Sequence, residues 1–141
     1  MATLKVLVRD PATGRLRLGI SRPPTLVSGI DLLVQIVALL FMENGGRSIF
    51  TPGRAGGLRS LLGTAITPDD PSELFADVRL IVNHVEQLIK EEQVRTRRPA
   101  SEQLKALQLI DIIPDSANPE IEVQVAVINE EQQQQQAVVV I

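Results

Sequence analysis

Apolar and polar residues follow two different repeats along the chain, and each repeat predicts one kind of element. Between Ser28 and Asn44 the apolar residues recur every three or four positions, as in a helix with one buried face. A longer helix is predicted from Pro71 and Ser72 by the stripe Leu74, Phe75, Val78, Ile81, Val82, Val85, Leu88 and Ile89. Ser28 can cap the first helix, and Asn44-Gly45-Gly46 predicts its end.

In other parts of the chain, strict alternation of apolar and polar residues predicts β-strands. Apolar residues at 121, 123, 125 and 127 alternate with Glu122, Gln124 and Ala126, which is typical of a strand with one buried face. The β-rich runs 3–9 and 15–20 enclose turn-forming residues and predict an N-terminal hairpin. Further strands are expected near 107–113 and 137–141. The sequence predicts an α+β fold with a small mixed or antiparallel sheet packed against two or three helices, an N-terminal β-hairpin and C-terminal β-strands.

The remaining segments predict connections and a division of the chain. Residues 45–57 form a Gly/Arg-rich connector, and the charged residues 91–103 suggest an exposed connection. The Gln run 132–136 reads as a flexible loop tip. A length of 141 residues allows one compact domain with an extended arm. We therefore expect an N-terminal hairpin extension at 1–22 and a main domain at 23–141.

Composition excludes several classes of function. Without Cys there is no disulfide, thiolate nucleophile or cysteine zinc site, and a single His excludes schemes that need two imidazoles in one chain. Three Phe and no Trp or Tyr argue against stacking platforms for single-stranded nucleic acid. The N-terminus lacks a secretory signal pattern. The most apolar run, Leu32–Met42, is too short for a bilayer core, so no membrane is expected as a partner. Because exposed aromatic rings are scarce, no nucleic acid is expected as a partner either.

Charge is divided unevenly along the chain, which has a net charge of −3. Residues 1–70 carry eight basic and five acidic side chains, whereas residues 71–141 carry six and twelve. Such a split favours complementary protein neighbours. Eleven of the fourteen basic residues are Arg, whose planar fork suits fixed carboxylate pairing. Interfaces within an assembly are a reasonable expectation.

Three groups of residues are candidates for reactive sites. Gly53–Gly57 could cradle a phosphate, but the spacing and the Lys-Ser/Thr of a P-loop are missing, which favours a plain turn. His84 has no carboxylate three or four positions away and reads as a histidine at the boundary of the apolar stripe. The adjacent carboxylates at 69–70, 91–92 and 130–131 lie in polar surroundings. No catalytic, metal-binding or cofactor-binding residue is predicted, and no cofactor is expected.

Two segments are candidates for protein contacts. Arg95, Arg97 and Arg98 form a basic patch that either meets a partner or is simply solvated, because flanking Glu residues weaken its reach. The β-branched terminal run of Val138, Val139, Val140 and Ile141 either closes its own sheet as an edge strand or adds to a neighbour's sheet. Both alternatives stay open for each segment.

The order of these pieces resembles a known family. Ser28-Gly29 leads an apolar helix, Gly45-Gly46-Arg47 follows, then Pro52, Gly56-Gly57-Leu58, Leu61-Leu62, a long amphipathic helix and terminal strands. This order is similar to the small baseplate wedge protein of contractile phage tails, the lysozyme-like sheath-initiator family shared with type VI secretion and other contractile injection systems. The family commonly has Glu at the place of Gly46, and Glu-Pro-Arg where this chain has only Arg98-Pro99-Ala100.

The resemblance implies a structural protein and no enzyme. It implies six copies around the tail tube in the virion baseplate, assembled in the host cytoplasm, with tail sheath protein, larger wedge proteins and the tube or hub as partners. The terminal strand would be paired with the first sheath ring, and Arg47, Gly56 and Gly57 would hold the connector against the helices. We expect a buried or interface contact for Arg47, and a positive φ or a close backbone approach at one of the two glycines.

Two alternatives of other classes remain. A generic adaptor would use the stripe of the long helix to bind another helix, and exposed Leu74, Val78 and Val85 would favour it. A small hydrolase is the other alternative, against which the lone His and the missing Cys, Trp and Tyr count.

Overall fold

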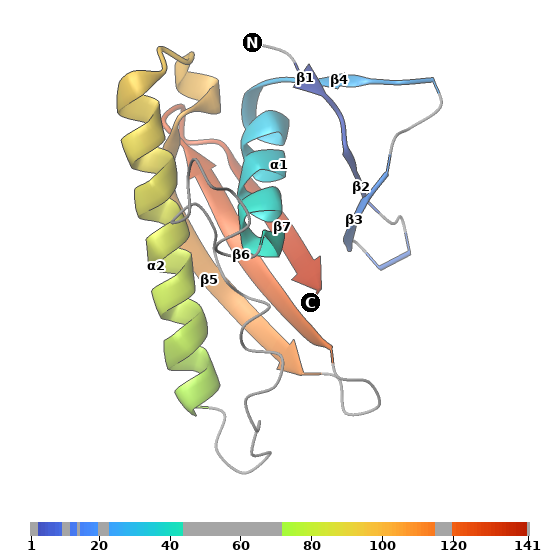
Figure 1. The fold of residues 1–141 in the computed structure, drawn as a ribbon, viewed down its shortest axis with the longest axis vertical. Helices are drawn as coiled ribbons and strands as arrows, with labels where there is room; N and C mark the ends of the chain where they lie inside the picture. Colours follow the sequence, from blue (N-terminus) through green and yellow to red (C-terminus); the bar gives the residue numbers. More distant parts are fainter. Residues whose placement is uncertain are drawn as a thin grey trace.

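Two α-helices cover one face of a three-stranded antiparallel sheet (Figure 1). A computed structural model describes residues 3–9, 12–13, 15–19, 23–43, 72–114 and 120–140. The helices are α1 (Gly29–Met42) and α2 (Ser72–Arg95), and the sheet has the order β5 (Leu104–Pro114), β6 (Ile121–Asn129), β7 (Gln134–Val140). Helix α1 packs on β6 and β7, and α2 packs on β5. The predicted α+β class is confirmed.

Four short strands form the N-terminal arm. Strands β2 (Leu7–Arg9) and β3 (Leu16–Leu18) pair as the predicted hairpin, while β1 (Thr3–Leu4) pairs with β4 (Leu26–Val27). The hairpin packs on its own chain, because the side chains of its residues 7 and 16 belong to the main core. The pairing of β1 with β4 crosses the expected boundary between residues 22 and 23, and the division into 1–22 and 23–141 stays a prediction.

The core lies between the helices and the sheet. Val123, Val125 and Val127 of β6 are completely buried on the helix side, as their alternation predicts. The matching stripe of α2 consists of Leu74, Val78, Val82, Val85 and Ile89, all buried. Phe75 departs from the predicted stripe with 38% of its surface exposed. Each fully buried side chain of this kind contributes about 1.5–3 kcal/mol, so helix α2 and the sheet stabilise each other.

Two predicted connections are wrong in part. Helix α2 continues to Arg95, so residues 91–95 are helical and only the following residues connect it to β5. Glu, Gln and Arg favour helices, and the Gln93 side chain in this last turn binds the neighbouring strand, which a solvated connection would not do. Strand β7 begins at Gln134, so residues 134–136 lie in the sheet and not in a loop tip. They continue the register of the apolar residues and pair with residues 126–128 of β6.

A buried polar cluster holds one end of the sheet. Asn129 is completely buried and donates from Nδ2 to the Ser101 carbonyl at 2.9 Å and to Gln133 Oε1 at 2.8 Å. The N–H of Gln133 donates back to Asn129 Oδ1 at 2.8 Å. Ser101 lies in the 3-10 helix η2 (Ala100–Glu102), directly before β5. The tight turn between β6 and β7 is therefore fixed to the start of the sheet.

Candidate interaction site

The terminal strand β7 is an edge strand of its own sheet. It pairs antiparallel with β6, from Gln134 opposite Ile128 to Val140 opposite Glu122. Ala137 and Val139 are completely buried beneath the helices, and Val138 is buried on the other face. No strand among the described residues pairs with the outer edge of residues 137–140. Strand β7 therefore pairs with β6 of its own chain along one edge. Along the apolar residues 137–140 its other edge has no strand partner among the described residues.

The opposite edge of the sheet, at β5, is covered by side chains of α2 over its first residues, 104–107. Gln93 accepts a hydrogen bond at Oε1 from the Leu104 N–H and donates from Nε2 to the Leu104 carbonyl at 3.3 Å. Glu86 Oε2 accepts the Leu107 N–H at 3.1 Å. Strand β5 also shifts register between residues 104 and 106 and between 109 and 111. Satisfied backbone groups and irregular register both discourage strand addition, so β7 is the more available edge.

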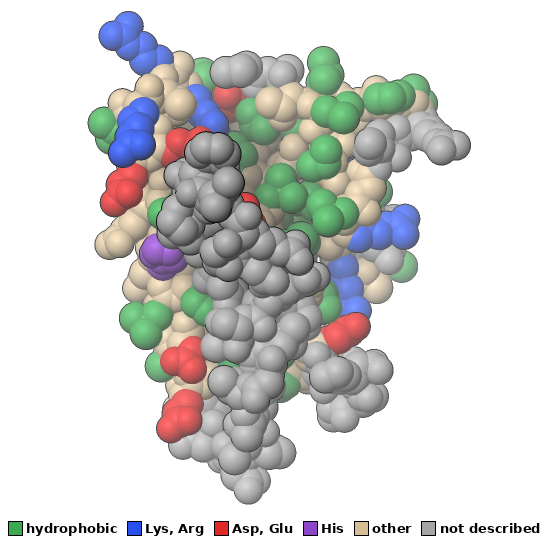
Figure 2. Space-filling model, viewed as in Figure 1, with side chains coloured by type: hydrophobic (Ala, Val, Ile, Leu, Met, Phe, Trp, Pro, Cys, Tyr) green, Lys and Arg blue, Asp and Glu red, His purple; other side chains and the backbone are tan. Residues whose placement is uncertain are grey.

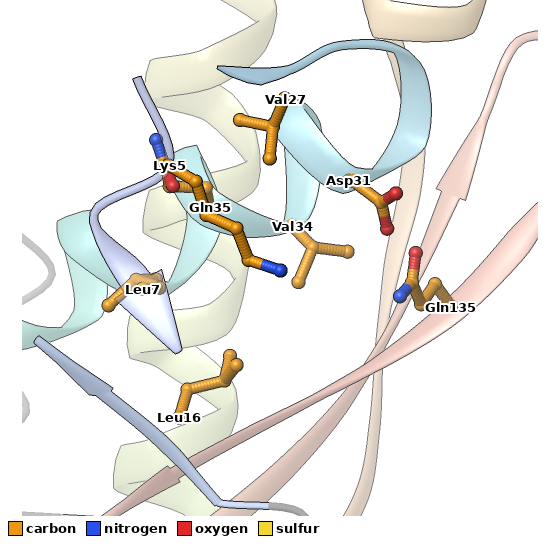
Figure 3. A pocket seen from close by; sticks show the side chains of 8 residues that line it. All are labelled: Lys5, Leu7, Leu16, Val27, Asp31, Val34, Gln35 and Gln135. Carbon is orange, nitrogen blue, oxygen red and sulfur yellow. The ribbon is translucent and has the colours of Figure 1, made fainter. Parts of the chain in front are cut away.

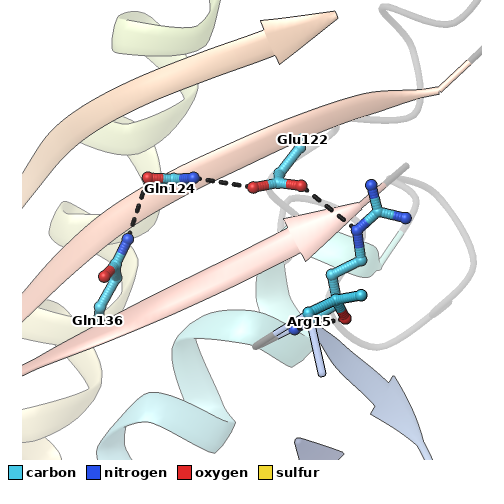
Figure 4. Close-up of polar contacts among 5 residues, drawn as sticks. Arg15, Glu122, Gln124 and Gln136 are labelled. Carbon is cyan, nitrogen blue, oxygen red and sulfur yellow. Dashed lines mark hydrogen bonds and ion pairs between the residues drawn. The ribbon is translucent and has the colours of Figure 1, made fainter. Parts of the chain in front are cut away.

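The N-terminal hairpin lies beside β7 without joining its sheet. Arg15, directly before β3, donates from Nε to Glu122 Oε2 on the middle strand at 3.3 Å (Figure 4). Glu122 Oε1 accepts Gln124 Nε2 at 2.8 Å, and Gln124 Oε1 accepts Gln136 Nε2 at 3.0 Å. The four side chains make a polar row from the hairpin across the outer face of β6 and β7.

A small cavity separates the hairpin from α1 and β7 (Figure 3). It has a volume of about 90 Å³, and its lining combines apolar residues of the hairpin and helix with polar groups from Lys5, Asp31, Gln35 and Gln135. Gln35 is buried and holds the arm by accepting the Val6 N–H at 2.9 Å and donating to the Leu4 carbonyl at 3.2 Å. Ligand sites generally measure about 300–1,000 Å³, so this cavity is a packing gap.

The predicted basic patch is only partly available for a partner. Figure 2 shows Lys and Arg side chains gathered toward the C-terminal end of α2. Arg95 and Arg97 are exposed there. Arg98 lies closer to the protein, with Nη2 at 3.7 Å from Glu92 Oε1 and its carbonyl accepting Gln103 Nε2 at 2.6 Å. Arg97 can meet an acidic partner as it stands, whereas Arg98 is already engaged within the chain.

Several predicted site residues lie outside the described residues. These are Arg47, Gly56, Gly57 and Ile141, together with the rest of the Gly53–Gly57 segment. His84 is exposed, as are Glu91, Glu130 and Glu131, in keeping with solvated positions. No cluster of His, Asp or Glu suited to a metal ion occurs among the residues that the structure describes. In the same part of the chain, neither helix is long and apolar enough to cross a membrane.

The adaptor hypothesis required an exposed stripe on the long helix. Leu74, Val78 and Val85 are instead buried, with 8%, 0% and 0% of their surface exposed. The chain's own sheet occupies the stripe that a partner helix would need. This observation removes the physical basis of that alternative.

Sequence reasoning missed the polar side chains that decide which edges are covered. Gln93 lies in the segment 91–103 that the sequence predicts as an exposed connection, and no contact is predicted there for Glu86, Arg15 or Glu122. A usable signal existed in part, because Glu86 and Gln93 are seven residues apart and so lie on one face of a helix. The contact between Arg15 and Glu122 spans 107 positions and has no local signature.

Comparisons with known proteins give one structural match. No protein-family model matches the chain, and no curated protein does. A chain of the cryo-EM structure of the anti-feeding prophage baseplate, six-fold symmetrised, is similar at 21% identity and a TM-score of 0.40. The match covers 95% of this chain and 78% of that one. A likeness at this level does not define a shared fold.

Proposed function

We propose that this chain is a structural component of a contractile tail baseplate and starts sheath assembly by pairing β7 with a strand of the first sheath ring. Six copies would surround the tail tube, with sheath protein and larger wedge proteins as neighbours. The support from sequence is the order of motifs from Ser28-Gly29 through Gly56-Gly57-Leu58 to the terminal strands. The proposal assigns no catalytic role to any residue.

The observation that carries the proposal is the difference between the two edges of the sheet. Side chains of α2 bind the backbone of β5 at residues 104 and 107, whereas residues 137–140 of β7 have no strand partner on their outer edge within the described residues. A strand added there would gain backbone hydrogen bonds along its length and apolar neighbours from Ala137 to Val140. A regular, apolar edge whose backbone groups have no strand partner is prone to pair with other chains, and a sheath strand would satisfy those groups.

The proposed joint is stiff. Only residues 130–133 separate β6 from β7, and backbone bonds close this turn from Gln132 N–H to the Asn129 carbonyl at 3.0 Å and from Asn129 N–H to the Gln133 carbonyl at 3.1 Å. The Gln run is therefore not a flexible connection, and β7 is held firmly in its own sheet from Gln134. A sheath strand would be added to the existing three-stranded sheet, and β7 would stay paired with β6.

Other proposed contacts rest on the resemblance alone. Arg47, Gly56 and Gly57 would hold the connector against the helices, and Arg97 would meet an acidic surface of a wedge protein. Ile141 would extend the pairing of β7 by one residue. Arg47→Ala is expected to lower the free energy of unfolding or of wedge assembly by about 1–3 kcal/mol, the usual loss when a buried hydrogen-bonding group is left without its partner.

The proposal is tested by placing one charge on the proposed edge. Val140→Lys and Gln134→Lys change the same face of the same strand by the same charge, but only residue 140 lies in the apolar half. We expect Val140→Lys to reduce binding of purified sheath subunits and Gln134→Lys to leave it close to wild type, as measured by co-sedimentation and by electron microscopy of sheath growth. Equal binding by all three proteins would contradict the assignment of this edge.

Deletion of residues 137–141 does not test the edge of β7 alone. Ala137 and Val139 are part of the core, so their removal takes away packing beneath α1 as well as the edge. The truncated chain is therefore expected to lose stability together with the edge. Point substitutions at partly exposed positions separate loss of binding from loss of folding.

A further inference from the structure

The N-terminal hairpin approaches the same edge of β7 that the proposed function requires to be open. Strand β3 lies next to β7, yet no backbone hydrogen bond joins the two among the described residues. Two hydrophobic residues of the hairpin, Leu7 and Leu16, are buried with 3% and 9% of their surface exposed. The hairpin is thus held beside the edge by side chains, without completing the sheet.

One ion pair crosses the end of β7. Glu122 stands on β6 opposite Val140, and Arg15 comes from the hairpin on the far side of β7. Figure 4 shows the Arg15 side chain passing the tip of the β7 arrow to reach Glu122. The two side chains therefore form a clasp over the last residues of the strand. A partner strand that paired with residues 137–140 would need the space beside them.

We propose that the β2–β3 hairpin is a displaceable guard of the β7 edge, closed by the clasp between Arg15 and Glu122. The inference rests on the proposed function, since it concerns access to the same edge. In the free subunit the hairpin would shield the edge from strands of other copies. When a sheath strand arrives, the clasp opens, the hairpin moves aside, and the incoming strand takes its place next to β7.

The polar contacts oppose opening only weakly, whereas opening exposes Leu7 and Leu16, which are buried in the core, so pairing with the incoming strand must offset that loss. The Arg15 side chain is 42% exposed, so water can replace its bond to Glu122 at little loss. The absence of backbone pairing between β3 and β7 within the described residues means that no ladder has to break. When the clasp opens, Glu122 keeps its bond from Gln124. The base of the arm is held separately, through the two hydrogen bonds of Gln35, so the hairpin can move without releasing the whole arm.

Opening and locking variants test the guard in the full chain. Arg15→Gln breaks the clasp, and Arg17→Gln is the matched control because Arg17 is exposed on β3 and carries the same charge. We expect Arg15→Gln to bind sheath subunits about two- to fivefold faster than wild type, the range that a partly exposed ion pair allows. Arg17→Gln should bind at the wild-type rate.

The lock uses the absence of cysteine from the chain. The double variant Arg15→Cys/Glu122→Cys, joined by a short bis-maleimide, should bind sheath subunits at least about tenfold more slowly than the same variant without the linker. Circular dichroism and thermal melting of both forms check that the fold is kept. Hydrogen exchange at the amides of residues 137–140 gives a readout without sheath, and it should be faster in Arg15→Gln and slower in the locked form.

The outcomes separate the guard from the proposed function. Wild-type binding rates and wild-type exchange in both the Arg15→Gln and the locked proteins would overturn the guard, even where Val140→Lys still abolishes binding. Normal binding by Val140→Lys would instead overturn the proposed edge. If wild type itself fails to bind sheath, the proposed function fails, and the exchange rates at 137–140 still decide whether the hairpin shields this strand.

Discussion

The carboxylate of Glu102 accepts the backbone N–H of Gly29 at 3.2 Å, which joins the first residue of α1 to η2 across 73 positions of sequence. Ser28 occupies the N-cap position, but its side chain makes no cap hydrogen bond, contrary to the role expected for it. A carboxylate at this place also complements the positive end of the helix dipole. The cap of α1 is therefore supplied by tertiary structure.

Removal of this cap should destabilise the fold. Glu102 is 1% exposed, and Glu102→Ala leaves the Gly29 N–H without its acceptor. We expect a loss of about 1–3 kcal/mol in the free energy of unfolding, measured by urea denaturation. Glu130→Ala, which removes an exposed carboxylate near the same end of the sheet, is the control and should change stability little. Equal stability of the two variants would contradict the role of Glu102.

The backbone at Gly29 should make this position intolerant of any side chain. Its φ is +61°, a left-handed conformation that costs a residue with a Cβ about 1–2 kcal/mol, while space is ample because the nearest atom would be 3.9 Å away. Gly29→Ala should lower the melting temperature. At Gly19 an added Cβ would also meet only an ordinary contact, 3.5 Å from Val8, and no left-handed φ is involved. Gly19→Ala should therefore melt close to wild type.

The turn between β6 and β7 contains a second left-handed residue, Gln132, with a φ of 65°. The backbone bond from the Asn129 N–H to the Gln133 carbonyl closes a three-residue loop, 130–132, and such loops favour Gly at the left-handed position. Gln132→Gly should therefore raise stability by up to about 1 kcal/mol, since relief of strain exceeds the added entropy of the unfolded chain. The same change one residue later, Gln133→Gly, should lower stability because it removes the acceptor Oε1 of the buried Asn129. Thermal melting of the two variants in parallel checks the sign of each effect.

Covering of the β5 edge by Gln93 can be tested directly. Gln93→Ala removes both partners of the Leu104 backbone, so we expect a loss of about 1–2 kcal/mol and a greater tendency to associate. Gln87→Ala changes the same residue type at an exposed position of the same helix and should do neither. Denaturation gives the stability, and light scattering gives the association. A Gln93→Ala protein that stays monomeric at wild-type stability would show that the edge needs no cover.

The elements could be predicted from sequence wherever a single repeat decides burial. The alternation at residues 121–127 and the stripe of α2 led directly to a sheet covered by helices, because period 2 and period 3.6 each bury one face. The Gln run was misjudged because strand pairing with β6 outweighs the weak local preference of residues 134–136. The contacts that decide the site, Glu102 with Gly29 and Arg15 with Glu122, join residues far apart in sequence, and no pattern in one chain reveals such pairs.

Gln35 anchors the N-terminal arm to α1. Gln35 is a buried polar residue on the apolar face of α1, and its amide binds the N–H of Val6 and the carbonyl of Leu4 as a neighbouring strand would. Gln35→Leu keeps a similar side-chain volume but leaves both backbone groups without a hydrogen-bond partner. We expect a loss of about 1–3 kcal/mol in the free energy of unfolding. The loss should be local, because among the described residues the start of the arm is held otherwise by the two-residue pairing of β1 with β4 and by the bond from the Lys5 N–H to the Thr25 carbonyl at 2.8 Å.

Trypsin reports this local release, since Lys5, Arg15 and Arg17 all lie in the arm. We expect Gln35→Leu to be cleaved within residues 3–19 faster than wild type, while cleavage in α2 keeps its wild-type rate. Val34→Leu is a suitable comparison, because it enlarges a buried side chain at the adjacent position of α1 without removing a backbone partner. Uniformly faster cleavage throughout Gln35→Leu would mean that the arm and the core unfold as one unit. In that case the arm could not move separately, and the guard proposed for β7 would lose its mechanical basis.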